Sequence, residues 1–477
     1  TMGPRSAPCQ GLRFQGLRFQ GLRLIVLLIG ILGIALTGQA QERAPIVFPN
    51  TQYEPVDWTD LEGWDGDDHA AAFAAFLASC RTLDAKHRHE RDLTAIPSAL
   101  RDICDLARQA VPLDEDGARK FFEENFRPIR INKLGDTDGF LTGYYEPIIA
   151  GSRVPTGEFT APLYRRPPNL AVSGWRRLGK DAFPSKGVRV GRRVGRRKIV
   201  PYYTRAEIED GALDGWHLEI CYLHDQVDVL FAQIQGSARI RLEDGTIVRV
   251  NYDSHNGWPY TPVGRILIDD KLMTKDQVSM QSIRTWMEAN PDLAKEVRRE
   301  NKSYVFFRIT GLATEDEAVG GEGVELMPGR SIAIDRSLHA YGTPFFIQAD
   351  LPIANQKADT KFDRLVIAQD TGSAIVGPAR ADIYFGAGDE AARIAGRIKH
   401  AGEFVMLIPR ELDPVAAGRD TPLPPERPSG FSVGLTTMVD PTAVDPPAEA
   451  MPRAANSAAA ATPAAPLHPS GRSRRKK

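Results

Sequence analysis

The stretch Ala368–Gly388, AQDTGSAIVGPARADIYFGAG, joins two apolar segments of strand type through a loop that contains glycine and proline. Asp370 follows the first segment, and Asp382 lies inside the second. The strand-like runs in this part of the chain are SYVFFRI, SIAID, TPFFIQ, RLVIAQ, ADIYF and FVMLIP, and one helical pattern, DEAARIAGRIKHAG, separates the last two. Short strands with so few helices between them favour a small closed barrel, because a parallel sheet would alternate strands with helices throughout.

The remainder of the 477-residue chain divides into two kinds of segment, and this length suggests about two or three domains. Helical periodicity predicts helices in HAAAFAAFLASC, SALRDICDLARQA, DEDGARKFFEENF, SMQSIRTWMEA and PDLAKEVRREN. Residues 139–269 instead show short β-like runs divided by Gly, Pro and Asn. The sequence therefore predicts a mainly β protein with some α-helix.

The charge balance excludes a protein that binds polyanions over its whole surface. Lys and Arg total 60, and Asp and Glu total 61, whereas a global nucleic-acid binder would be more basic. The basic run at residues 186–199 lies inside the β-like block and predicts a solvated hairpin loop rather than a nucleic-acid patch. It could still touch an anionic polymer of the cell envelope.

The N-terminus predicts export. Arginines precede an apolar run from Leu24 to about Leu36, and the small-residue segment Gly38–Ala40 follows it. This pattern is typical of a secretory signal cleaved after Ala40, with an uncleaved anchor as the alternative. At the other end, the Pro- and Ala-rich tail from residue 413 to residue 477 predicts disorder.

Two of the four cysteines have predicted partners. Cys80 and Cys104 each lie on the apolar stripe of a predicted helix, which suggests a disulfide that pins a helical hairpin in an exported protein. Two reduced core cysteines are the alternative. Neither C-x-x-C nor H-E-x-x-H occurs, so no metal site is predicted.

A formal dinucleotide fingerprint, G-x-G-x-x-A from Gly386 to Ala391, follows the strand that carries Asp382. Only one further strand follows the helix, so a nucleotide-binding βαβαβ half cannot be completed. We interpret the motif as a tight turn that opens a helix, and we expect no cofactor.

Three aspartates end or interrupt the strands of the predicted barrel: Asp335, Asp370 and Asp382. Asp335 and Asp370 precede turn-forming residues, which is typical of aspartates whose side chains accept hydrogen bonds from the nearby backbone. Asp382 instead has large apolar neighbours, which would raise the proton affinity of its carboxyl and suit it to act as a general acid. A structural role for Asp382 is the alternative, because structural networks also perturb acids.

Nine motifs resemble the membrane-bound lytic murein transglycosylase A family, in the family's order from about Phe73 to Pro409. They are GYYEP, PLYRRPPNL, VPYYTRAEI, IQGSARIRLEDG, NYDSHNGWPY, VGRILID, SYVFFR, RSIAIDRSLHAYGTPFF and AQDTGSAIVGPARADIYFGAGDEAARIAG. Three features depart from the family pattern: the loop from Asp370 to Asp382 is one residue longer than in some relatives, Ala238 replaces a common glycine, and a lipid-anchoring cysteine is absent after the signal.

The resemblance implies a double-psi β-barrel with a second β-barrel inserted into it and a helical segment at the N-terminus. The implied parts are a leader at 1–40, the helices and first barrel strands at 41–147, the inserted barrel at 148–283, the catalytic 3D domain at 284–412 and the tail at 413–477. A groove between the barrels would bind a peptidoglycan strand.

The resemblance also implies the activity and its residues. Asp382 would be the single catalytic acid, supported by Asp370 and Asp335, in non-hydrolytic cleavage of peptidoglycan to 1,6-anhydromuramyl products. Sugar contacts would come from Tyr144, Tyr145, Gln235, Ser237 and Arg239. We expect a monomer in the periplasm of a Gram-negative bacterium, with possible envelope association. The alternatives are a hydrolase that uses Asp335 or Asp370 as its second carboxylate, and a wall-binding protein without activity.

Overall fold

The structure is a computed structural model that describes residues 49–87, 95–174, 183–185, 188–196, 198–414 and 416. All of these belong to one compact unit, Thr1–Thr421. The predicted signal segment and nearly all of the predicted C-terminal tail lie outside the described residues. Among the described residues, no helix combines the length and the apolar character needed to cross a membrane.

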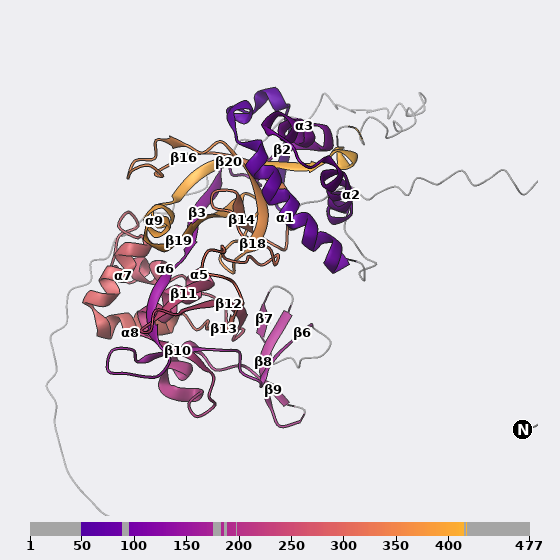
Figure 1. Ribbon diagram of the computed structural model, residues 1–477. Helices are drawn as coiled ribbons and strands as arrows, with labels where there is room; N and C mark the ends of the chain where they lie inside the picture. The colour runs from indigo at the N-terminus through magenta and orange to yellow at the C-terminus, as the bar shows by residue number, and fades with distance from the viewer. Residues whose placement is uncertain are drawn as a thin grey trace, which may run out of the picture. The chain divides into compact units, whose positions relative to one another are not determined.

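The strands around the Asp370–Asp382 loop form a closed barrel (Figure 1). They belong to an eight-stranded sheet in the order β1-β2-β20-β15-β18-β14-β19-β3, and β20 also pairs with β3, which closes a ring of six strands. The ring consists of β3 (Gly139–Glu146), β14 (Ser331–Ile334), β15 (Pro344–Gln348), β18 (Arg364–Thr371), β19 (Arg380–Ala387) and β20 (Lys399–Pro409). β1 (Thr51–Pro55) and β2 (Phe126–Lys133) extend the sheet, and α9 (Gly388–Ala395) links β19 to β20. The closed barrel predicted from this region is confirmed.

The pleat of these strands separates an interior face from an outer face. Side chains such as Leu141, Ile332 and Ile383 are fully buried and fill the interior with their neighbours. Because successive side chains of a strand point to opposite faces, the residues between them point outward. The outer face is therefore available for helices and for a functional site.

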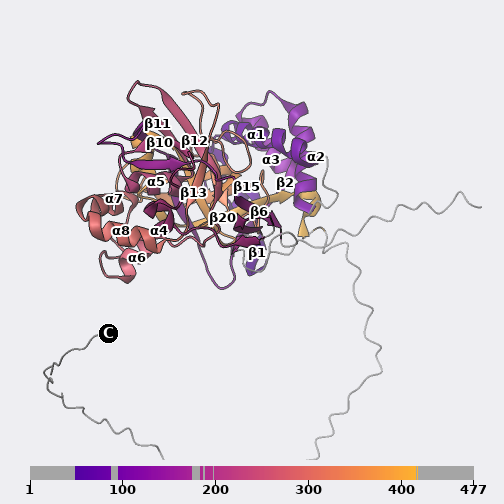
Figure 2. The ribbon, with the colours of Figure 1, turned by 90° about the horizontal axis from the view of Figure 1, so that it is seen from below.

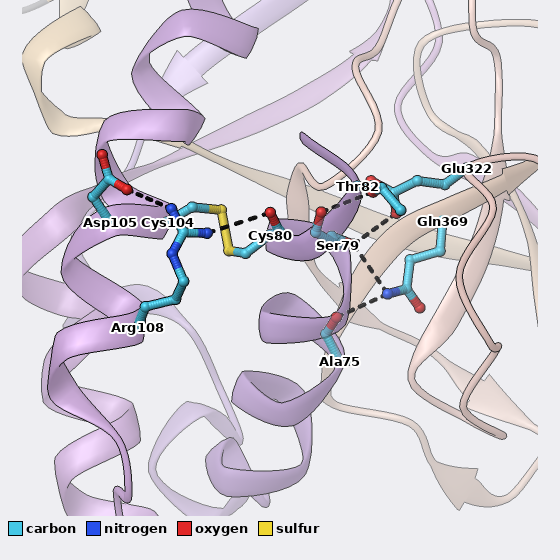
Figure 3. The surroundings of a disulfide bond; sticks show 9 residues. All are labelled: Ala75, Ser79, Cys80, Thr82, Cys104, Asp105, Arg108, Glu322 and Gln369. Carbon is cyan, nitrogen blue, oxygen red and sulfur yellow. Dashed lines mark hydrogen bonds and ion pairs between the residues drawn. A yellow bond between two sulfur atoms is a disulfide. The ribbon is translucent and has the colours of Figure 1, made fainter. Parts of the chain in front are cut away.

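Three N-terminal helices cover one part of this outer face. They are α1 (His69–His87), α2 (Ala95–Ala110) and α3 (Glu115–Asn125), and Figures 1 and 2 show them together, away from α6, α7 and α8. Their apolar stripes share one core with outward-facing residues of β15, β18 and β20, including Phe346, Ile367 and Val405. The structure contains the Cys80–Cys104 disulfide, which joins α1 to α2 with an S–S distance of 2.03 Å (Figure 3).

A second, six-stranded sheet interrupts the first barrel between β3 and β14, in the order β13-β12-β11-β4-β10-β5. Its strands are β4 (Ile148–Ser152), β5 (Ala161–Tyr164), β10 (Glu219–Leu223), β11 (Ser237–Leu242), β12 (Ile247–His255) and β13 (Val305–Ile309). An isolated bridge between Arg165 and Phe307 links its two edge strands and closes it. The predicted fold class, mainly β with α and one barrel inserted in another, is confirmed.

One strand assignment from the sequence is wrong. SYVFFRI was placed with the strands of the first barrel, but β13 pairs antiparallel with β12 of the inserted sheet. The chain leaves that sheet for α7 (Met280–Ala289) and α8 (Pro291–Glu300) and then returns to it. The boundary predicted at Ile283 consequently falls inside α7.

Two helices were also missed in the block that was interpreted as β-structure. α5 (Gln226–Gln235) begins after Asp225, whose carboxylate accepts hydrogen bonds from the backbone N–H groups of Val227 and Asp228. α6 (Val263–Asp269) follows β12, and both helices pack with α7 and α8 in a separate core.

The smaller elements include the predicted basic hairpin. β8 (Val188–Val194) and β9 (Lys198–Val200) pair antiparallel, and Gly195 and Arg196 between them are exposed, so the hairpin prediction is confirmed for its described part. β8 also pairs with β6 (Leu170–Gly174) and β7 (Phe183–Ser185). The short remaining elements are β16 (Asp350–Leu351), β17 (Thr360–Lys361), α4 (Arg205–Glu207) with a π-turn at Ile208–Ala212, and 3₁₀ turns at Trp58–Asp60, Trp64–Gly66 and Arg410–Leu412.

Candidate active site

One row of outward-facing residues crosses four neighbouring strands of the first barrel. Thr142 of β3 pairs with Asp382 of β19, Asp382 pairs with Ala333 of β14, and Ala333 pairs with Asp370 of β18. Paired residues of neighbouring strands project to the same face of a sheet. The row therefore brings Asp370 and Asp382 to one outer surface, on the part of the barrel that the N-terminal helices leave open.

A shift in register places Asp370 in this row. Ile332 pairs with Ala368, but the next residue, Ala333, pairs with Asp370, so Gln369 is an extra residue in β18. Strict alternation from the interior residue Ala368 would have turned Asp370 into the barrel. An extra residue of this kind re-aims the side chains that follow it and is common beside active sites.

The Asp382 carboxyl is half-buried and held on one side. Thr142 Oγ1 donates to Asp382 Oδ1 at 2.6 Å, and Arg380 Nη2 donates to Thr142 Oγ1 at 2.7 Å. Burial raises the pKa of Asp382, and the charge of Asp370 adds to this, while Arg380 and the Thr142 hydrogen bond act in the opposite direction. Because burial is the largest of these effects, Asp382 keeps its proton to a higher pH than an ordinary aspartate does.

Asp370 is fixed by three donors. Tyr144 Oη donates to Oδ2, and the backbone N–H groups of Gly321 and Thr371 donate to Oδ1, each at 2.8 Å. Burial raises the pKa of Asp370, and these hydrogen bonds oppose the rise. Burial also raises the pKa of Tyr144, so its phenol keeps the proton that it donates.

Asp335 braces the loop between β18 and β19 and lies outside the row. Its buried carboxylate accepts hydrogen bonds from Ser337 N at 2.9 Å, Ser337 Oγ at 2.6 Å and Gly377 N at 3.0 Å. This is the backbone-bonding role that the sequence allowed for this aspartate.

The two tyrosines predicted to contact sugar lie on opposite faces of β3. Tyr144 is only 9% exposed, and its ring centroid lies 5.3 Å from that of Tyr384. Little of the Tyr144 ring is left for a sugar, and its hydroxyl serves Asp370. Tyr145 instead lines a pocket of about 350 Å³ with Asp228 and Arg284, which does not include Asp382.

The other three predicted sugar contacts lie at the junction between the barrels. Gln235 Oε1 accepts a hydrogen bond from Tyr145 N at 3.0 Å, and Ser237 is buried at the start of β11. Arg239 donates to the buried Glu146 at 2.7 Å and to two backbone carbonyls of residues 314–316. In this structure Gln235 therefore ties the end of α5 to β3 of the first barrel, and Arg239 ties β11 of the inserted sheet to β3 and to residues 314–316.

Sequence reasoning missed Phe140, Thr142 and Arg380. Phe140 pairs with Arg380 two residues along the strands from the Thr142–Asp382 pair, and it is 47% exposed. The Arg380 guanidinium lies 5.3 Å from the centre of the Phe140 ring. Alternation in the segment GFLTGYYEP was the available signal, because residues 140, 142 and 144 must share one face of a strand.

Within the described part of the chain, no group of three or more His, Cys, Asp or Glu side chains could hold a metal ion.

Two protein-family profiles match the chain: the MltA specific insert domain over residues 140–308 and the 3D domain over residues 330–408. The membrane-bound lytic murein transglycosylase A of Vibrio cholerae is 32% identical over 302 residues, which cover 61% of this chain and 71% of that protein. The chain belongs to the membrane-bound lytic murein transglycosylase A (MltA) family. The family resemblance predicted from the nine motifs is confirmed.

Solved structures similar to this MltA-family protein agree in fold. The membrane-bound lytic murein transglycosylase of Agrobacterium tumefaciens is 34% identical, with a TM-score of 0.66 over 77% of this chain and 99% of that chain. MltA of Escherichia coli with bound chitohexaose is 26% identical, with a TM-score of 0.52 over 77% of this chain and 95% of that chain.

Proposed function

We propose that this protein is an exported peptidoglycan lytic transglycosylase. It cleaves the β-1,4 bond between N-acetylmuramic acid and N-acetylglucosamine without water and leaves a 1,6-anhydromuramyl end. The observation that carries the proposal is the Asp382 carboxyl, which is half-buried on an outer face of the barrel and has a raised pKa. The names of the relatives support the substrate class and a place in the cell envelope.

Asp382 acts first as a general acid. Thr142 accepts a hydrogen bond from Arg380, so its own hydroxyl proton points to Asp382 Oδ1. This leaves Oδ2 to carry the catalytic proton. Transfer of that proton to the glycosidic oxygen accompanies cleavage of the bond between this oxygen and C1 of the muramyl sugar.

Asp382 then acts as the base. The C6 hydroxyl of the same muramyl sugar attacks C1, the C1–O6 bond forms, and the hydroxyl proton returns to the Asp382 carboxylate. The proton lost in the first step is regained in the second, and no water is consumed. Because the nucleophile is tethered to the electrophilic carbon, a single carboxyl is sufficient for both steps.

The contacts of the other two aspartates favour this reaction over hydrolysis. An ordinary glycosidase needs a second carboxylate that either activates water or attacks C1. Asp370 already accepts from three donors, and so does Asp335. We therefore assign Asp370 to tuning and positioning, and Asp335 to bracing the loop before β19.

For substrate binding, we propose that the exposed Phe140 ring stacks against a sugar next to the scissile bond. It projects from the same face as Asp382, two register positions away. Aromatic rings suit the apolar faces of sugars, and the polar sugar edges would find donors such as Arg380. Tyr145, Gln235, Ser237 and Arg239 remain proposals for more distant parts of the glycan strand.

The decisive experiment is product analysis of isolated sacculi by mass spectrometry. Lytic transglycosylation releases muropeptides that are lighter by one water than the products of a hydrolase. We expect anhydro ends in the wild-type digest. Reducing ends would support the hydrolase alternative, and binding to sacculi without release would support a wall-binding protein.

A further inference from the structure

Glu322 is a buried glutamate that the proposed chemistry does not use. It is 1% exposed and lies in the turn Gly320–Gly323, in the segment that leads from β13 back to β14. Two hydroxyl groups of α1 contact its carboxylate: Ser79 Oγ donates to Oε2 at 2.7 Å, and Thr82 Oγ1 shares its proton between Ser79 O at 2.8 Å and Oε1 at 3.1 Å. Figure 3 shows these side chains meeting beside the disulfide. Glu322 thus anchors the turn to a helix outside the barrel.

The same turn holds the end of β18. Gly321 N donates to Asp370 Oδ1 at 2.8 Å, and Glu322 N donates to Gln369 O at 3.0 Å. A Cβ atom at Gly320 would lie 2.5 Å from Gln369 O, so only glycine allows this approach.

The extra residue of β18 is tied to the same helix. Gln369 Nε2 donates to Ala75 O at 2.8 Å and to Ser79 Oγ at 3.0 Å, and Gln369 is fully buried (Figure 3). Ser79 therefore contacts both Glu322 and the residue whose insertion places Asp370 on the outer face. Helix α1 fixes Asp370 through these two connections.

We infer that Glu322 is a positioning residue for the proposed reaction: it fastens the Gly320–Gly323 turn to Ser79 and Thr82 so that Gly321 N–H holds the Asp370 carboxylate beside Asp382. The inference rests on the proposed function. It extends the reacting site to helix α1 through the contacts of Ser79 and Thr82.

Electrostatics predicts the direction in which the pH–activity profile shifts when the Glu322 contacts are lost. Asp370 faces Tyr144, Tyr341 and Asp382, and Asp382 also faces Arg380. Loss of the Gly321 hydrogen bond raises the pKa of Asp370 further, because that bond favours its charged form. Over the pH range in which Asp370 then keeps its proton, its charge no longer raises the pKa of Asp382. Asp382 then loses its proton at a lower pH, and the alkaline limb of the activity profile moves toward acid.

The test compares Glu322→Ala with the conservative Glu322→Gln and with the helix variant Ser79→Ala/Thr82→Val. For Glu322→Ala we expect kcat to fall about 10- to 100-fold with KM little changed, because the reacting groups are misplaced while the sugar contacts stay. The helix variant should change in the same direction. Glu322→Gln should recover most of the loss, because its amide can still exchange hydrogen bonds with both hydroxyls.

The pH profile and a matched control distinguish a positioning role of Glu322 from a role in stability alone. Glu209→Gln neutralises a buried carboxylate that is paired with Arg298 and Arg299 in the inserted domain, away from Asp370. We expect it to lower stability without moving the alkaline limb. Combining Glu322→Ala with Thr82→Val should be no worse than Glu322→Ala alone, because both changes break the contact between Glu322 and Thr82.

A folded Glu322→Ala enzyme with wild-type kcat and an unmoved alkaline limb would overturn the inference. If Glu322→Ala does not fold, the milder helix variant decides by the same two readouts. A wild type that releases anhydro products, together with normal Glu322 variants, would overturn this inference alone. A wild type that releases none would overturn the proposed function, and the inference would fall with it.

Discussion

Asp370 and Asp382 flank the same residue, Ala333, from opposite sides of β14. Since neighbouring strands lie about 4.8 Å apart, the two aspartate Cα atoms are about 10 Å apart across β14. The negative charge of Asp370 raises the pKa of Asp382, while the positive charge of Arg380 lowers it. Burial is the main cause of the raised pKa of Asp382, and these two neighbours adjust it in opposite directions and can be changed one at a time.

Asp370→Asn should move the alkaline limb of the pH–activity profile to lower pH. The substitution removes the charge that raises the pKa of Asp382, so Asp382 loses its proton earlier as the pH rises. Activity should therefore fall more at alkaline than at acidic pH, because less of Asp382 carries the proton that a general acid must donate. The measurement is the rate of sacculus solubilisation across a pH series.

Arg380→Met is a control that should shift the alkaline limb of the pH–activity profile in the opposite direction. It removes the charge that lowers the pKa of Asp382, so the alkaline limb should move to higher pH, whatever happens to the maximum rate. Shifts of the same sign in both variants would contradict the electrostatic assignment.

Asp382→Asn should stabilise the folded protein at neutral pH. A carboxyl whose pKa is raised by folding contributes stability that is fully present below its unfolded pKa and is lost as the pH rises through its folded pKa. The neutral amide avoids that loss, so the midpoint of thermal unfolding should exceed that of the wild type at about pH 7.5, and the difference should shrink toward about pH 4. If the variant were less stable than the wild type at both pH values, the charged Asp382 carboxylate would not destabilise the folded protein, and the prediction would be wrong.

Phe140→Ala should weaken substrate binding without changing the chemical step. Loss of an aromatic contact worth about 0.5–1.5 kcal/mol predicts a KM that is roughly two- to tenfold higher, with kcat little changed. Phe140→Tyr should retain binding. Leu134→Ala is the matched control, because Leu134 is also an exposed apolar residue, 66% accessible, and lies before β3. An unchanged KM in Phe140→Ala would remove this ring from the sugar site.

Removal of the disulfide should lower the free energy of unfolding. Cys80 and Cys104 are 24 residues apart in sequence, and closing a loop of that size restricts the unfolded chain by about 3 kcal/mol. Urea unfolding of the Cys80→Ser/Cys104→Ser double variant measures the loss. The stability of the double variant should not change when a reductant is added, whereas the stability of the wild type should fall to that of the double variant. A wild type insensitive to reductant would contradict the prediction.

Local patterns were sufficient to predict the N-terminal helices and the barrel strands β14, β15, β18, β19 and β20, but not β3. Short apolar runs such as ADIYF indicate buried strands, and the spacing of Phe73, Phe76 and Cys80 indicates a helix buried on one face, as the structure shows. The same reasoning failed for α5, because its apolar run VDVLFAQI is buried on several sides and reads equally well as a strand. Only the capping by Asp225 marked it as a helix.

The site was predicted in part for a related reason. The high proton affinity of Asp382 could be predicted from its apolar neighbours. Its contacts with Thr142 and Arg380 depend on the pairing of β3 with β19, which no local pattern reports. The place of Asp370 depends on one extra residue in β18. Tyr144 could not be separated from Tyr145 by residue type, because the choice between burial and a pocket is made by which face of β3 each occupies.

Turnover of isolated sacculi by wild type, Asp382→Asn and Asp370→Asn, compared side by side, tests the central claim most directly. We predict that Asp382→Asn still binds sacculi but releases anhydromuropeptides at least about a thousandfold more slowly. Asp370→Asn should keep measurable activity at acidic pH. If Asp382→Asn retained activity within about tenfold of the wild type, Asp382 could not be the proton donor, and the proposed mechanism would be wrong.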